Sequence, residues 1–172
     1  MRFHAEMHIS GPTNTIASLL ADPTFYLGLE LPDVGKPEVL DVHQDGTWSV
    51  FRLRYVVAGD QSRILRGLAG SASLAWLQDV RVDLTTGSGQ LHYEAEFDPL
   101  RIYGTGGFTL TPDRGSTIFR FDGEVVVAVP GLGRLLEREI VHQLVNRLSI
   151  ETSALDARLR RDAESDHPTG TL

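Results

Sequence analysis

Apolar and polar residues alternate from Arg2 to Ile9, a pattern that predicts a β-strand with one buried face. Two short segments with apolar residues at helical spacing follow this strand. The first ends at Asp22–Pro23, and the second begins at Pro23 and ends at Pro32. The chain therefore begins with one strand and two short helices.

Six further strands are predicted at 39–43, 48–57, 74–84, 90–97, 103–111 and 117–129. Most of their connections are short and contain Gly, Asp or Pro, which is typical of an antiparallel meander. The exception is 58–73, a longer segment rich in small residues around an amphipathic fragment at 64–68. We interpret this segment as a mobile cover of the sheet.

Leucine, isoleucine and valine recur at steps of three and four residues from position 132 to 159, which predicts one long amphipathic helix. We expect its charged residues on the solvent face: Arg134, Glu137, Arg138, Arg147, Glu151 and Arg158. From position 160 onward the sequence is polar and aperiodic. This predicts a single domain over 1–160 and a disordered tail over 161–172.

The composition of this 172-residue chain excludes several kinds of binding partner and site. Sixteen Lys and Arg against 23 Asp and Glu give a net charge of −7, which repels the phosphates of nucleic acids. The chain has no cysteine, which excludes thiolate metal sites and cysteine nucleophiles. No apolar run approaches the ~20 residues of a membrane span. We therefore expect a cytoplasmic monomer or homodimer that binds no nucleic acid and is not inserted in a membrane.

The order of these elements resembles the START-like, or helix-grip, fold of the SRPBCC superfamily. This is an α+β fold in which a curved, seven-stranded antiparallel sheet wraps around a long C-terminal helix. Residues 123–140, with the sequence GEVVVAVPGLGRLLEREI, and Gln143–Leu144 after them resemble the end of the actinobacterial DUF2505 family. So does the middle of the chain, where a strand with Arg54–Tyr55 leads through a leucine-bearing loop to a strand with Trp76. The resemblance covers about residues 1–160.

This resemblance implies a cavity between the sheet and the long helix, where START-like proteins hold lipids, sterols or polyketides. DUF2505 is itself a family of unknown function, so no catalytic residue carries over. The alternation of the strands and the spacing of the helix give these candidate ligand-binding residues: Phe51, Tyr55, Trp76, Gln78, Tyr93, Phe119, Phe121 and Leu144. Tyr55, Gln78 and Tyr93 are the informative ones, because a buried polar group needs a partner.

Other chemistry has little support in the sequence. His4 and His8 share one face of a strand but lie too far apart to bind one ion, so we expect no metal and no cofactor. The carboxylate pairs Glu94/Glu96 and Asp79/Asp83 are expected to form surface ion pairs with Arg52 and Arg54. The glycines at 104–107 lie within a strand, which favours a bend or bulge over a phosphate loop.

Three functions remain open at this point. The chain binds or carries a small apolar molecule, or it is an aromatase/cyclase-type enzyme with a buried acid or base, or it is a protein-interaction module with a filled core. We favour the binding protein, because the predicted inner face carries no Asp, Glu, His or Arg.

Overall fold

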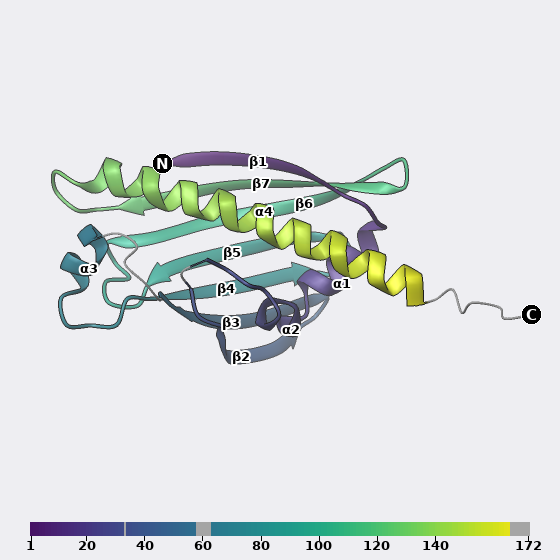
Figure 1. The fold of residues 1–172 in the computed structure, drawn as a ribbon, viewed down its shortest axis with the longest axis horizontal. Helices are drawn as coiled ribbons and strands as arrows, with labels where there is room; N and C mark the ends of the chain where they lie inside the picture. Colours follow the sequence, from purple (N-terminus) through teal and green to yellow (C-terminus); the bar gives the residue numbers. More distant parts are fainter. Residues whose placement is uncertain (33, 58–62, 166–172) are drawn as a thin grey trace, which may run out of the picture.

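The computed structural model describes residues 1–32, 34–57 and 63–165, and within them the predicted α+β helix-grip architecture is confirmed (Figure 1). Seven antiparallel strands form one sheet in the order β1-β7-β6-β5-β4-β3-β2. Their bounds are β1 Arg2–Ile9, β2 Glu38–Asp45, β3 Trp48–Val56, β4 Ala75–Asp83, β5 Ser88–Ala95, β6 Ile102–Asp113 and β7 Ser116–Val127. The first and last strands of this order, β1 and β2, form its two edges.

In the described ranges four helices accompany the sheet: α1 Thr13–Leu20, α2 Pro23–Leu27, α3 Arg63–Ala69 and α4 Gly133–Ser165. The long helix α4 crosses the sheet diagonally, while α1 and α2 lie together near the ends of the strands (Figure 1). Among the described residues, none of these helices combines the length and the apolar character needed to cross a lipid bilayer.

Three boundaries differ from the sequence prediction. Helix α2 ends at Leu27 rather than at Pro32, because Gly28 follows as its C-terminal cap. The segment expected to be a cover contains helix α3, while residues 58–62 lie outside the described part. Helix α4 continues to Ser165, past the expected domain end at 160, so the first five residues of the predicted tail are helical.

Two clusters of buried side chains make up the core. One lies where α1 and α2 cover the sheet, and it includes Phe51, Phe119 and Phe121. The other lies at the opposite end, where Leu65 of α3 packs in one cluster with Leu136 and Ile140 of α4. Burial of these apolar faces is the main force that holds α4 and α3 on the sheet.

Glycines of the inner face make room for aromatic rings. A Cβ at Gly106 or Gly123 would overlap ring carbons of Phe121, whose ring stacks on Phe3 at a centroid distance of 5.6 Å. The register of β6 with β5 and β7 runs without interruption past these glycines, so of the expected bend or bulge the bulge is absent there and the bend stays a prediction. The glycines allow rings to lie against the sheet instead.

The outer face of the sheet carries the predicted ion pairs. Arg52 Nε and Nη2 donate to both carboxylate oxygens of Asp79, at 2.6 and 2.9 Å, and Arg54 binds Glu96 in the same bidentate manner at 2.7 Å. Asp83 is different, because its carboxylate accepts from the backbone N–H and the hydroxyl of Thr85. The pairing expected for Arg52 and Arg54 is thus confirmed, and Asp83 supports a turn rather than an ion pair.

Candidate functional site

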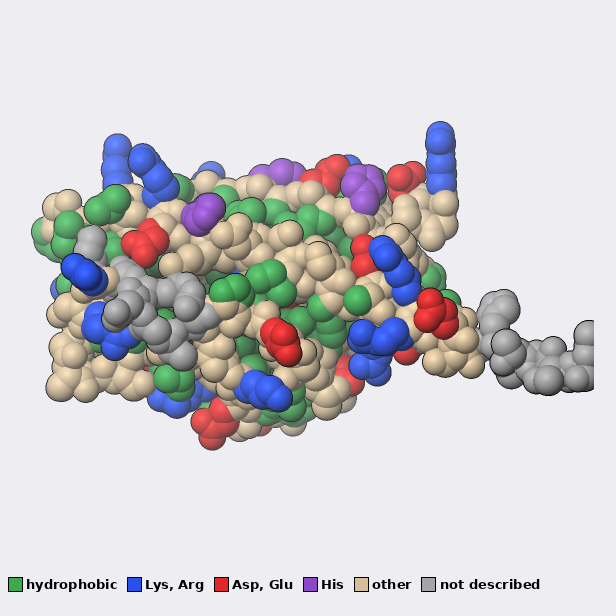
Figure 2. Space-filling view, in the orientation of Figure 1, with side chains coloured by type: hydrophobic (Ala, Val, Ile, Leu, Met, Phe, Trp, Pro, Cys, Tyr) green, Lys and Arg blue, Asp and Glu red, His purple; other side chains and the backbone are tan. Residues whose placement is uncertain are grey.

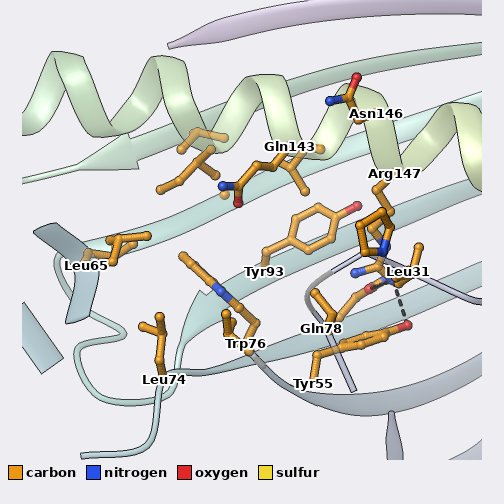
Figure 3. Close-up of a pocket in the computed structure, with 18 of the residues that line it drawn as sticks. Leu31, Tyr55, Leu65, Leu74, Trp76, Gln78, Tyr93, Gln143, Asn146 and Arg147 are labelled. Carbon is orange, nitrogen blue, oxygen red and sulfur yellow. Dashed lines mark hydrogen bonds between the residues drawn. The ribbon is translucent and has the colours of Figure 1, made fainter. Parts of the chain in front are cut away.

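A cavity of about 180 Å³ lies between the concave face of the sheet and α4, where the two core clusters meet. Most of the side chains around it are apolar, and they come from the segment after α2, from α3, from the central strands and from α4. Leu65 and Leu74 border one end of the cavity and Leu31 lies near the other (Figure 3). Hydrophobic side chains also show between the charged ones along the middle of α4 on the molecular surface (Figure 2).

Five of the eight candidate residues line this cavity. They are Tyr55 of β3, Trp76 and Gln78 of β4, Tyr93 of β5 and Leu144 of α4. Alternation along each strand places the four sheet residues on the inner face, and the register puts Gln78 directly opposite Tyr93. Tyr55, Gln78 and Tyr93 therefore come from three neighbouring strands to one side of the cavity (Figure 3).

The other three candidates, Phe51, Phe119 and Phe121, are not cavity residues. All three are buried in the core cluster under α1 and α2, where their rings contact other aromatic rings. Phe51 lies against Tyr26 and Phe119 stacks on Phe108, at centroid distances of 5.4 and 5.3 Å. The alternation of the strands correctly predicted that these three side chains point to the inner face of the sheet. Neighbouring aromatic rings pack closely against them and fill the space in front of them.

Arg147 of α4 is the main residue that the sequence analysis misplaced. It was expected on the solvent face, yet its side chain is 17% exposed and lines the cavity. One guanidinium nitrogen, Nη2, donates to the Tyr55 hydroxyl and to Gln78 Oε1, both at 2.6 Å. The guanidinium carbon also lies 4.2 Å from the centre of the Tyr55 ring, within the range of a cation–π contact.

Glu151 completes this buried network and was also wrongly expected at the surface. Its carboxylate accepts from Arg147 Nε at 2.7 Å and is 8% exposed, one helical turn beyond the arginine. A buried charge needs such a partner, so the two residues enter the interior as a pair. Helix α4 thus brings an Arg and a Glu into the interior, whereas the argument for a simple binding protein rested on the inner face of the sheet alone.

The surroundings of the cluster keep its groups in fixed protonation states. Burial raises the pKa of Tyr55 to about 12, although the nearby Arg147 opposes this, and the pKa of Tyr93 is raised further for the same reason. Burial alone would lower the pKa of Arg147, but its contacts with Tyr55 and Glu151 outweigh burial and raise that pKa. At neutral pH the tyrosines are uncharged donors and the arginine is a cation.

One signal in the sequence could have located this pair. Leu144, Arg147, Glu151 and Leu155 follow one another at steps of three, four and four residues, which places them on one stripe of the helix. Leu155 is fully buried, so a charged pair lies within an apolar stripe rather than opposite to it. Spacing, rather than residue type, identifies the buried face here.

The described residues form neither a metal site nor a phosphate-binding loop. Nowhere in 1–32, 34–57 and 63–165 do three His, Asp or Glu side chains gather as metal ligands would. His4 forms a pair with Asp122 at 2.9 Å, on the outer side of β1 and β7. The glycines at 104–107 are part of β6 and do not precede a helix, so they lack the setting of a phosphate loop.

Comparison with known proteins gives one family and one fold. Residues 4–159 match the family described as "Protein of unknown function (DUF2505)". A sequence search of curated proteins found no match. Because the family match covers most of its length, the chain belongs to the DUF2505 family.

Solved structures of similar fold cover nearly the whole chain at low sequence identity. Zhui aromatase/cyclase from a Streptomyces species is 16% identical, with a TM-score of 0.61 over 100% of this chain and 99% of that one. A START superfamily protein from Mycobacterium smegmatis is 17% identical, with a TM-score of 0.57 over 93% and 97%. Norcoclaurine synthase from Thalictrum flavum, in complex with dopamine and hydroxybenzaldehyde, is 11% identical, with a TM-score of 0.58 over 94% and 87%. These similarities show a START-like fold.

Proposed function

We propose that this member of the DUF2505 family binds a small, mainly apolar molecule in the cavity between the sheet and α4. The observation that carries the proposal is the cavity itself, a space of about 180 Å³ walled mainly by apolar side chains, with a few polar groups at one side. Ligand sites of small molecules usually have this composition. Proteins of similar fold include one whose structure holds two small aromatic compounds, which supports the same class of ligand.

The size of the cavity favours a compact ligand. An apolar cavity of ~150 Å³ is large enough for benzene, whereas drug-sized ligands occupy pockets of ~300–1,000 Å³. A cavity of about 180 Å³ therefore suits one or two fused rings better than a long acyl chain. Among lipid, sterol-like and polyketide-like molecules, we favour small cyclic compounds of the polyketide type.

The aromatase/cyclase alternative draws on one observation, the buried Arg147–Glu151 pair beside the cavity. Acid–base chemistry is most efficient when the pKa of the catalytic group lies near the working pH. Tyr55 and Tyr93 have pKa values raised far above neutrality, and Arg147 stays charged. These groups are suited to hold and orient a ligand oxygen, so binding is the better supported function.

The interaction-module alternative predicted a core filled by side chains, and the cavity argues against it. Cytoplasmic location and a monomeric or homodimeric state remain predictions from the sequence. They do not affect the test of ligand binding.

Binding can be tested with the neutral two-ring fluorophore 1-naphthylamine, whose emission depends on the polarity of its surroundings. We expect saturable binding by the wild-type chain and at least tenfold weaker binding by Leu144→Trp, which fills part of the cavity from α4. Leu135→Trp is the matched control, because Leu135 lies on the same helix but is 53% exposed. Equal binding by all three proteins would place the probe elsewhere and refute the proposal.

Native mass spectrometry of gently purified protein, followed by solvent extraction, identifies any molecule retained from the host. A discrete apolar adduct that is lost in Leu144→Trp and kept in Leu135→Trp is the expected result. An adduct that is kept by both variants would be bound outside the cavity.

A further inference from the structure

The side of the cavity near Arg147 presents hydrogen-bond donors that have no acceptor in the described part of the chain. Gln78 is 1% exposed, and its amide nitrogen Nε2 is a buried polar atom without a hydrogen-bond partner. The Tyr93 hydroxyl has no partner among the described residues, and its residue is 8% exposed. The Tyr55 oxygen accepts from Arg147 and its own proton is not used by another described residue.

The amide oxygen of Gln78 and the carboxylate of Glu151 already accept hydrogen bonds. Gln78 Oε1 accepts from Arg147 Nη2, which fixes the amide orientation, because the reverse orientation would bring two donors together. Glu151 accepts from Arg147 Nε and is not among the cavity-lining residues. A ligand in the cavity therefore meets donors at this side, with Gln78 and Tyr93 directly opposite each other on β4 and β5.

The charge of the cluster is balanced before a ligand arrives. Arg147 and Glu151 contribute +1 and −1, so their sum is zero. A carboxylate ligand would add an uncompensated negative charge to a mainly apolar cavity, which is unfavourable. An alcohol brings a proton of its own, and if the Tyr93 oxygen accepts that proton, Tyr93 can no longer donate to the same alcohol oxygen.

We propose that the ligand carries an uncharged carbonyl oxygen, as in a ketone, aldehyde or quinone, and that this oxygen accepts hydrogen bonds from Gln78 Nε2 and the Tyr93 hydroxyl. The inference deepens the proposed function and rests on it. Tyr93, Gln78 and Tyr55 all point toward Arg147 around one region of the cavity (Figure 3). A carbonyl oxygen at this place would accept a hydrogen bond from Gln78 Nε2, the buried donor that lacks an acceptor. This hydrogen bond would add affinity to that gained by burying the apolar part of the ligand.

Four probes of nearly one shape test this proposal by calorimetric titration: 2-acetylnaphthalene, 1-(2-naphthyl)ethanol, 2-ethylnaphthalene and 2-naphthoate. The ketone is expected to bind about tenfold more tightly than the hydrocarbon, since one satisfied hydrogen bond of ordinary strength corresponds to that ratio. The alcohol and the carboxylate are expected to bind more weakly than the ketone.

Tyr93→Phe removes one unpaired hydroxyl and keeps the ring, so it is expected to fold and to lower the ketone-to-hydrocarbon ratio at least threefold. Gln78→Glu keeps an oxygen for Arg147 and removes the amide donor, and it should lower the same ratio. Tyr26→Phe is the control, because the Tyr26 hydroxyl donates to the Leu20 carbonyl away from the cavity. It should leave the ratio unchanged.

The outcomes separate the two proposals. If the ketone and the hydrocarbon bind equally well, the cavity binds apolar molecules but the carbonyl inference is wrong. Tightest binding of 2-naphthoate would show an anion site and would also overturn it. If none of the probes binds, the proposed function fails and the inference fails with it.

Discussion

The buried pair Arg147–Glu151 makes a strong prediction about stability. Glu151→Leu leaves the arginine charge in the interior without its partner, and removing one member of a buried ion pair costs about 3–5 kcal/mol. This range applies because the two side chains are only 17% and 8% exposed and are joined at 2.7 Å. For a chain of this length the loss corresponds to a decrease in Tm of about 6–20 °C.

The same helix supplies a matched control. Arg158 and Asp162 have the same spacing of four residues, but they are 53% and 58% exposed and lie 3.5 Å apart. Asp162→Leu should change the free energy of unfolding by less than about 1 kcal/mol, as is usual for surface pairs. The double variant Arg147→Met/Glu151→Leu should recover most of the loss, because it leaves no unpaired charge.

Urea unfolding followed by far-UV circular dichroism measures all four proteins under one set of conditions. The expected order of stability is wild type and Asp162→Leu together, then the double variant, then Glu151→Leu. If Glu151→Leu were as stable as Asp162→Leu, the Arg147–Glu151 pair would be screened by solvent and the buried network described above would be wrong.

Four further predictions concern other parts of the molecule. Gly106→Ala forces a Cβ into an aromatic ring and should cost about 1–3 kcal/mol in thermal or urea unfolding, whereas Gly67→Ala in α3 meets open space and should be neutral or stabilising by up to about 1 kcal/mol. The Thr85 hydrogen bonds lower the pKa of Asp83 to about 2, so its carboxylate stabilises the fold fully above pH 4 and loses this effect as the pH falls toward 2. The difference in Tm between wild type and Asp83→Asn should therefore shrink over that interval, and a constant difference would contradict the assignment. Because the pKa of Tyr55 is about 12, the affinity for 2-acetylnaphthalene should be flat from pH 6 to 9, and calorimetry at several pH values would detect a titrating group in the site. Amide hydrogen exchange in α3 should be faster than in β4 if α3 opens as a cover, and equal protection would remove that role.

The fold was predictable because its information lies in short-range patterns. Alternation along the strands and turn residues between them fixed the meander, and the spacing of leucines fixed α4. The sequence showed only an amphipathic fragment where α3 forms, because glycine, serine and alanine around it weaken the helical pattern. In the fold, Leu65 of α3 is buried in one cluster with Leu136 of α4.

The site was predictable only in part. Alternation tells which face of a strand is inward, but it does not tell whether another side chain fills the space in front of a residue, as happens at Phe51 and Phe121. Arg147 and Glu151 were placed outside because charged residues are usually exposed. Their burial depends on each other and on Tyr55 and Gln78, which are distant in sequence.

The position of both charges on one helix also bears on how the protein folds. Arg147 and Glu151 are one turn apart on α4, so their ion pair needs no contact with the sheet to form, and we expect it to form before the helix meets the sheet. On this expectation the two charges of the helix face cancel before docking, so docking does not require the transfer of a lone charge out of water. Moving the acid to the sheet, with Gln78→Glu and Glu151→Gln, should slow refolding in stopped-flow experiments, because each charge would then be desolvated separately until the two surfaces meet.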